Sequence, residues 1–195
     1  MLADRNISTS NEEYISEFQA KHVGKRFRGA SLHRVTFGES GTAEEVIKWI
    51  QKEKNFLVFL GAPGIGKTYF CSALIPWISD KIQYFRYFKE RDFLSRIRES
   101  MNLEKSSYLE TVKMMCDDNF MILDDLGSSG FNEWRKEVFF EAIDIRYESQ
   151  LPTVFTSNLT KEQIFQGLGK RTYSRLFAKE NLIIEMHEAE DLRQK

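Results

Sequence analysis

The sequence predicts an α/β fold in which helices flank a five-stranded parallel sheet. Five short apolar segments alternate along the chain with longer segments that repeat apolar residues at helical spacing. Strands separated by helices run in the same direction, which gives a parallel sheet covered on both faces. A chain of 195 residues, with 42% hydrophobic and 29% charged residues, is large enough to bury one such core.

A complete phosphate-loop motif supports this prediction. Residues 61–68 read GAPGIGKT and match G-x-x-x-x-G-K-[ST] at every position. The glycines let the backbone turn tightly and point N–H groups at phosphate oxygens, and the dipole of the following helix adds to this attraction. Lys67 supplies a charge for the β- and γ-phosphates, and the Thr68 hydroxyl can bind magnesium. The alternative is a purely structural Gly-rich turn, but an apolar strand before the motif and a helical segment after it supply the context that a phosphate loop requires. The residues expected to bind the nucleotide are Gly61, Ala62, Pro63, Gly64, Ile65, Gly66, Lys67, Thr68 and Tyr69.

The individual elements follow from the apolar patterns. The expected strands are 56–60, 83–88, 120–123, 153–156 and 182–184. The expected helices are 41–54, 67–75, 90–101, 106–116, 132–149 and 170–178. The helix at 41–54 illustrates the pattern, because Val46, Trp49 and Ile50 share one face.

A pair of acids follows the strand in the segment NFMILDD, residues 119–125. In a parallel sheet this strand end lies at the same edge as the phosphate loop, where ligands bind. We expect Asp124 to hold magnesium through water, and Asp125 to polarise the attacking water as a general base. The alternative is a solvated turn that happens to carry two acids.

Two further candidates lie later in the chain. The segment LPTVFTSN ends in Asn158, whose amide can bond the attacking water or the γ-phosphate; alternatively, Asn158 caps a helix that begins near Thr160. In GKRTYSRLFA, Arg171 and Arg175 are four residues apart on one helical face. An arginine aimed at the γ-phosphate of a neighbouring subunit would accelerate hydrolysis, whereas the alternative is two solvated surface charges.

The segment 84–100 combines basic and aromatic residues. A basic groove with aromatic stacking surfaces binds single-stranded nucleic acid without reading its sequence. The net charge of −1 means that such a site must come from a local patch. Interspersed acids and apolar residues leave a plain amphipathic helix as the alternative. The residues expected to contact DNA are Arg86, Tyr87, Lys89, Arg91 and Arg98.

The remaining composition indicates a cytoplasmic protein. Cys71 and Cys116 are far apart in sequence, and neither lies in a C-x-x-C or other zinc-binding spacing. The first residues lack the apolar core of a signal peptide, and no apolar run is long enough to cross a membrane.

Taken in order, these motifs resemble those of the AAA+ ATPases, and within them the DnaC/IstB-like group of helicase loaders and transposition ATPases. The resemblance runs from about residue 25 to the end of the chain. It identifies GAPGIGKT as Walker A and MILDDLG, residues 121–127, as Walker B. It also implies that Asn158 is the sensor-one residue, that Arg175 is an arginine finger with Arg171 beside it, and that Arg193 has a sensor-two-like role. Because the chain ends at Lys195, the resemblance further implies little or no separate lid domain.

The resemblance sets the functional expectations. We expect an ATPase that uses ATP and Mg²⁺, self-associates in its ATP state and contacts single-stranded DNA, with no membrane partner. Residues 1–24 would be an N-terminal arm or short docking helix, and residues 25–195 the AAA+ ATPase domain. The expected role is loading of a ring-shaped replicative helicase; the alternative is an IstB-like helper of a transposase. A small-molecule kinase and a nucleotide switch with negligible turnover also remain open.

Overall fold

The structure is a computed structural model that describes residues 12–32, 40–52, 55–82, 84–102 and 107–186. In chain order its elements are α1 (Glu12–Phe18), the π-helix η1 (Gln19–Val23), the 3-10 helix η2 (Lys25–Phe27), α2 (Ser40–Lys52), β1 (Phe56–Gly61), α3 (Lys67–Lys81), β2 (Phe85–Lys89), α4 (Glu90–Asn102), α5 (Tyr108–Cys116), β3 (Phe120–Asp124), α6 (Glu133–Glu148), β4 (Thr153–Ser157), α7 (Lys161–Leu176) and β5 (Leu182–Met186).

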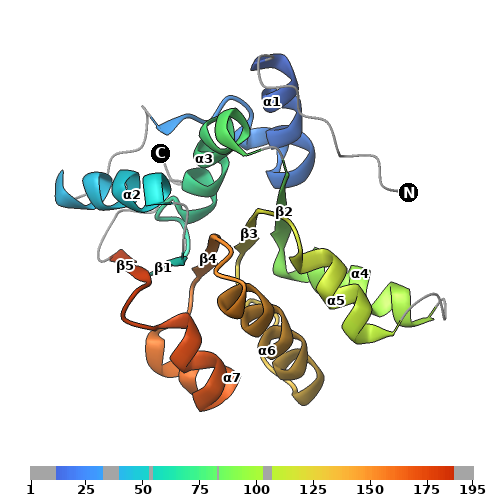
Figure 1. Cartoon of the computed structure of the whole chain (residues 1–195). Helices are drawn as coiled ribbons and strands as arrows, with labels where there is room; N and C mark the ends of the chain where they lie inside the picture. The colour runs from blue at the N-terminus through green and yellow to red at the C-terminus, as the bar shows by residue number, and fades with distance from the viewer. Residues whose placement is uncertain (1–11, 33–39, 53–54, 83, 103–106, 187–195) are drawn as a thin grey trace.

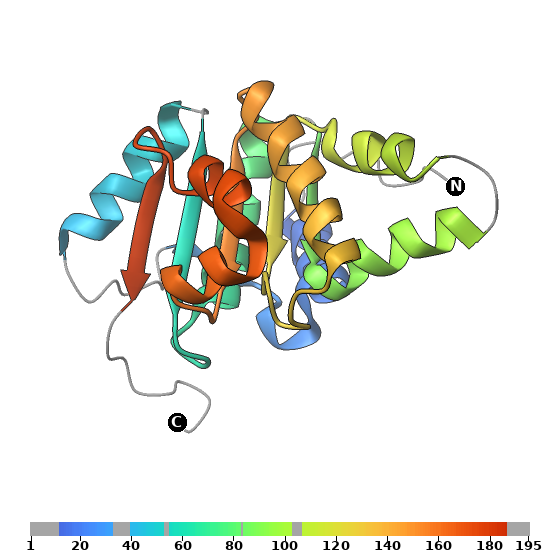
Figure 2. The same ribbon diagram turned by 90° about the horizontal axis from the view of Figure 1, so that it is seen from below.

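The five strands form one parallel sheet in the order β2-β3-β4-β1-β5, which confirms the predicted fold class. Figure 2 shows the arrows of β3 and β5 pointing toward the end of the sheet at which the loop after β1 lies. The register places Leu60 of β1 opposite Ser157 of β4, and Lys89 of β2 opposite Asp124 of β3. The carboxyl ends of four strands therefore meet along one edge.

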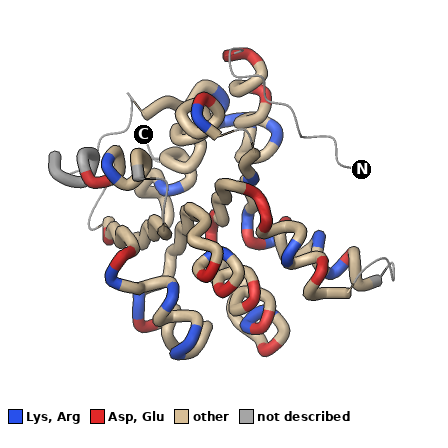
Figure 3. The backbone as a smooth tube through the Cα atoms, in the orientation of Figure 1, with Lys and Arg blue, Asp and Glu red and all other residues tan. Residues whose placement is uncertain are grey.

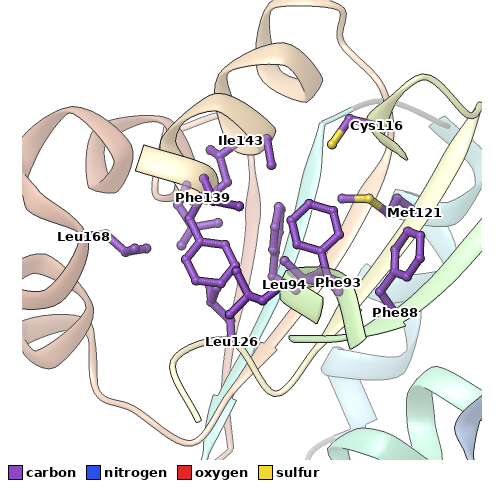
Figure 4. Packing of buried hydrophobic residues seen from close by; sticks show 14 of the residues in the cluster. Phe88, Phe93, Leu94, Cys116, Met121, Leu126, Phe139, Ile143 and Leu168 are labelled. Carbon is purple, nitrogen blue, oxygen red and sulfur yellow. The ribbon is translucent and has the colours of Figure 1, made fainter. Parts of the chain in front are cut away.

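Helices cover both faces of the sheet. Figure 1 shows α1, α2 and α3 on one face, and α4, α5, α6 and α7 on the other. Each face has its own apolar core: Trp49 and Phe70 belong to the first, whereas Phe93 and Phe139 belong to the second. Figure 4 shows how the rings of Phe88, Phe93 and Phe139 pack in the second core.

Local sequence signals set several helix starts. Ser107 and Glu110 form a reciprocal capping box at α5, and Thr160 forms one at α7 with Gln163. These pairs satisfy backbone N–H groups that a helix start leaves without partners. Helix α7 begins at Lys161, with Thr160 rather than Asn158 as its cap, and Gly169 (φ 79°) interrupts it directly before the predicted helix start at residue 170.

The structure extends α3 beyond the predicted end at residue 75. The helix continues through Pro76 to Lys81 because its residues are buried in the core on both sides of the proline. Proline has no N–H, so the carbonyl of Ser72, four residues earlier, receives no helical hydrogen bond from it. This carbonyl accepts a 2.9 Å hydrogen bond from Nε2 of Gln19 instead.

The described part of the N-terminal segment packs against the core. Phe18 and Val23 are buried in the same cluster as residues of α3, and Gln19 is only 1% exposed. The division of the chain into 1–24 and 25–195 stays a prediction. Among the described residues, no helix combines the length and apolar character needed to span a membrane.

Candidate nucleotide-binding site

The phosphate loop connects β1 to α3 at the carboxyl edge of the sheet. Gly64 and Gly66 have φ angles of 90° and 101°, in the left-handed region that side chains with a Cβ rarely adopt. Gly66 caps α3, and its carbonyl accepts a 2.8 Å hydrogen bond from the N–H of Phe70. Gly61 is required for a different reason, since a Cβ there would lie 2.3 Å from Cδ1 of Ile65 and 2.8 Å from the carbonyl of Met186. The glycines of the motif thus serve both the turn and its close packing.

Lys67 lies under this loop. Its Nζ donates hydrogen bonds of 2.7 and 2.8 Å to the carbonyls of Gly61 and Ala62, and the residue is only 5% exposed. Backbone oxygens of the loop therefore hold the ammonium group.

Asp124 is buried where β2, β3 and β4 lie side by side. Its Oδ2 accepts a 2.7 Å hydrogen bond from the hydroxyl of Tyr87, and its Oδ1 accepts one from the hydroxyl of Thr156. The residue is 1% exposed. The two hydroxyls supply the hydrogen bonds that a buried carboxylate needs, and they fix its orientation.

Asp125 lies one residue further and adopts a φ of 67°. This left-handed conformation turns it away from the strand, and Asp tolerates it better than most residues do. Its Oδ1 accepts a 3.1 Å hydrogen bond from Nδ2 of Asn158, and its N–H donates to the Thr156 hydroxyl at 2.9 Å. Burial raises the pKa of Asp125, and the negative charge of Asp124 raises it further. The two neighbouring acids therefore occupy different environments.

A cavity of about 410 Å³ collects most of the predicted nucleotide and catalytic residues. Asp125 and Asn158 face it from the ends of β3 and β4, whereas Asp124 lies behind them in the core. The cavity is lined by Gly64, Gly66, Lys67, Thr68, Tyr69, Asp125 and Asn158, together with Arg26 and Phe27.

Sequence reasoning missed Arg26 and Phe27 as lining residues. They belong to the short turn η2, far from the phosphate loop in sequence. Their signal in the sequence is the basic and aromatic segment KRFRGASL, residues 25–32. Glu90 was also missed: this fully buried carboxylate accepts hydrogen bonds from the N–H groups of Gly127 and Ser129, and so supports the loop that follows Asp125.

Arg171 and Arg175 do not line this cavity. Arg175 forms ion pairs with Asp144 and Glu148 of α6, the second at 3.7 Å, and its side chain is 19% exposed. The Arg171 guanidinium lies 4.5 Å from the centre of the Phe140 ring. Arg193 lies outside the described residues. The structure thus places Arg171 and Arg175 on the face that α7 shares with α6, and their roles stay predictions.

The prediction that Tyr87 exposes a ring for base stacking is wrong. Tyr87 is 6% exposed and points into the core, because its position on β2 faces Asp124. Arg86 is paired with Asp118, whereas Arg91 and Arg98 are exposed on α4. Figure 3 shows residues of both charges along α4. DNA contact by Arg86, Lys89, Arg91 and Arg98 stays a prediction.

The donor set of this site fits magnesium held mainly by a nucleotide. Mg²⁺ binds hard oxygen ligands and often uses one or two protein groups together with phosphate oxygens and water. Thr68 and Asp124 offer a hydroxyl and a carboxylate of this kind. Since both oxygens of Asp124 already accept hydrogen bonds, contact through water suits it better than direct coordination. The described residues contain no group of three or more His, Cys, Asp or Glu side chains that could hold a metal ion by themselves.

The sheet order and the edge at which these residues meet define a P-loop ATPase domain of the AAA+ type. Residues 43–177 match the model of the IstB-like ATP binding protein family. The chain therefore belongs to this family, an ATP-binding group of the DnaC/IstB-like AAA+ proteins.

Among the similar proteins are helicase loaders and an ATP-binding protein of an insertion sequence. The replicative helicase loader DnaI of Bacillus subtilis (strain 168) is 27% identical over 127 residues, which are 65% of this chain and 39% of DnaI. The ATP-binding protein proposed for insertion sequence IS232 of Bacillus thuringiensis subsp. berliner is 25% identical over 124 residues, 62% of this chain and 48% of that protein. The crystal structure of the DnaC helicase loader superposes with a TM-score of 0.67 at 25% identity, covering 83% of this chain and 99% of that one. This chain thus matches less than half the length of the two sequence relatives.

Proposed function

We propose that this protein hydrolyses ATP and uses the reaction to control a ring-shaped replicative helicase. The observation that carries the ATPase proposal is the cavity in which Lys67, Thr68, Asp125 and Asn158 come together from three separate segments. Membership of an ATP-binding family supports ATP as the ligand, and the helicase-loader relatives support a helicase as the partner.

Each side chain in this cavity has a proposed task. Loop N–H groups and Lys67 bind the β- and γ-phosphates and neutralise the charge that develops as the phosphoryl group transfers. Thr68, and Asp124 through water, would hold magnesium, which would supply positive charge at the same phosphates. Asp125 accepts a proton from the attacking water, and Asn158 orients the Asp125 carboxylate and that water.

The base end of the nucleotide would lie against Arg26 and Phe27. The Arg26 guanidinium lies 4.6 Å from the centre of the Phe27 ring, and both residues line the cavity. A flat aromatic and guanidinium surface suits stacking with a nucleobase. This placement puts the phosphates at the start of α3 and the base beside η2.

Lys67→Ala tests the nucleotide site. We expect ATP binding to fall below detection by isothermal titration calorimetry, because the variant loses the charge that meets the phosphates. Lys113→Ala, an exposed change on α5, is the matched control and should bind as the unmodified protein does. Since Lys67 is buried, circular dichroism must show a folded variant; unchanged ATP affinity in a folded Lys67→Ala protein would refute the site.

Transposition is the second candidate, and the IS232 relative favours it. The two roles differ in the protein that is retained by the ATP-bound form. Immobilised Asp125→Asn protein, loaded with ATP, should retain a purified hexameric helicase from the same organism. Retention of the transposase of a linked insertion sequence, with no retention of the helicase, would favour the second role.

A further inference from the structure

The wall formed by Arg26 and Phe27 belongs to a short segment whose position depends on other parts of the chain. Residues 24–30 form tight turns, with backbone hydrogen bonds from Phe27 to Gly24 and from Ala30 to Phe27. Figure 1 shows this segment running beside α3. Turns of this length do not determine by themselves how they lie against a helix, so tertiary contacts must place them.

Gln19 makes the principal contacts of this kind. Its Nε2 donates to the carbonyl of Ala30 at 2.8 Å and to the carbonyl of Ser72 at 2.9 Å. Its Oε1 accepts a 2.8 Å hydrogen bond from the N–H of Gly29. Both amide donors are therefore used, and one buried side chain joins the turn to α3.

Two features of α3 match this arrangement. Pro76 has no N–H, which leaves the carbonyl of Ser72 free of that helical bond and able to accept from Gln19. The Ser72 hydroxyl donates a 3.2 Å hydrogen bond to the carbonyl of Phe27, which is a second link between α3 and the turn. Ser72 lies one helical turn after Thr68, so the same turn of α3 carries the phosphate end of the cavity and supports its base end.

We propose that Gln19 is a positioning residue for nucleotide recognition, which sets Arg26 and Phe27 at the distance from α3 that a nucleobase requires. This inference rests on the proposed ATP site and adds to it a residue from the N-terminal segment. Gln19 is absent from the cavity lining and acts only through the turn. It also links α1 and η1 to the nucleotide, because η1 begins at Gln19.

The test separates the two ends of the nucleotide. Gln19→Met keeps the length of the side chain and removes all three hydrogen bonds. Isothermal titration calorimetry would measure the affinity for ATP and for inorganic tripolyphosphate, each with magnesium. Tripolyphosphate has the phosphates but no base, so its affinity should be unchanged, whereas the affinity for ATP should fall about tenfold. Gln51→Met, the same change at an exposed position of α2, should alter neither affinity.

The outcomes are distinct. Equal ATP affinity in Gln19→Met and the unmodified protein, or equal losses for ATP and tripolyphosphate, would overturn the positioning role. If Gln19→Met does not fold by circular dichroism, Ser72→Ala replaces it, because this variant removes only the link to Phe27. It should lower ATP affinity selectively but by a smaller factor, and no selective loss in Ser72→Ala would equally overturn the role. Failure of the unmodified protein to bind ATP would instead refute the proposed function itself.

Discussion

The hydroxyl of Tyr87 donates a 2.7 Å hydrogen bond to Oδ2 of Asp124 in the interior of the protein. The bond joins two neighbouring strands of the sheet, where Thr156 of β4 completes the group by donating to Oδ1. Burial raises the pKa of Tyr87, and the charge of Asp124 raises it further, so the phenol stays protonated and acts as a donor. A residue that sequence analysis assigned to DNA contact therefore orients the proposed magnesium carboxylate.

Replacing Tyr87 with Phe tests this contact. The free energy of unfolding should fall by about 1.5–3 kcal/mol, because a buried carboxylate oxygen loses a charge-assisted hydrogen bond. Urea unfolding followed by circular dichroism would measure the change. Tyr84→Phe is the control at a 39% exposed tyrosine, and it should change stability by less than about 0.5 kcal/mol. Equal stability of the two variants would show that the Tyr87 bond contributes nothing.

The two neighbouring acids should fail in different ways when each is changed to Asn. Asp124→Asn should weaken the magnesium-dependent part of ATP binding, whereas Asp125→Asn should keep ATP bound but stop hydrolysis. Asn is the appropriate replacement at residue 125, since it also tolerates the φ of 67° there. Titration of ATP with and without magnesium, together with phosphate release, separates the effects. If both variants hydrolyse ATP at the wild-type rate, the two acids have no catalytic role and are only part of a turn.

The raised pKa of Asp125 predicts a pH effect on stability. The ordinary value is 3.8, and burial followed by the charge of Asp124 raises the pKa in the folded protein. A carboxyl group with a raised pKa binds its proton more tightly when folded, so its favourable contribution is present below pH 3.8 and is lost as the pH rises through the folded pKa. Asn has no carboxyl group to ionise. As the pH rises through the folded pKa of Asp125, the Asp125→Asn variant should therefore become more stable relative to the unmodified protein. If the difference in unfolding free energy between Asp125→Asn and the unmodified protein does not change with pH, the prediction is wrong.

Mutations can decide whether Arg175 acts as an arginine finger or serves only the ion pair with Asp144 in the same chain. Arg175→Ala should bind ATP normally but hydrolyse it about 10³-fold more slowly if the arginine reaches a neighbouring subunit. Asp144→Asn removes the ion-pair partner and leaves the arginine, so it should retain hydrolysis. Mixing Arg175→Ala with Lys67→Ala should restore part of the activity in hetero-oligomers. Equal loss in Asp144→Asn, or no rescue once hetero-oligomers have formed, would make Arg175 a structural residue.

Exposed arginines of α4 provide a test of single-stranded DNA binding. We expect weak, sequence-independent binding that requires ATP, because assembly of several subunits would align many charges along one strand. Arg91→Ala combined with Arg98→Ala should reduce the dependence of affinity on salt concentration, since each neutralised phosphate releases counterions. Fluorescence anisotropy of a labelled oligonucleotide at several salt concentrations measures this slope. An unchanged slope, or equal affinity without nucleotide, would place DNA contact elsewhere.

Much of the site was predictable from sequence because its signals are local. The glycines of residues 61–66 and the acids at the end of β3 lie within segments of a few residues, and a parallel sheet brings strand ends to one edge. Asn158 and Asp125 were both predicted to act on the attacking water, and in the structure Nδ2 of Asn158 lies 3.1 Å from Oδ1 of Asp125. Residue type and distance along the chain were enough for these predictions.

The sequence by itself thus determined the α/β class, the phosphate loop and the set of strand-end polar residues. Only the tertiary structure decided that Tyr87 faces inward, that Arg175 pairs with Asp144, and that Gln19 supports the turn at the base end of the cavity. These contacts join residues 11 to 53 positions apart, or lie between helices whose relative rotation no local pattern encodes. Their physical reason is packing: which side of a short strand is buried, and which backbone carbonyl a proline leaves free, depend on the elements that surround them.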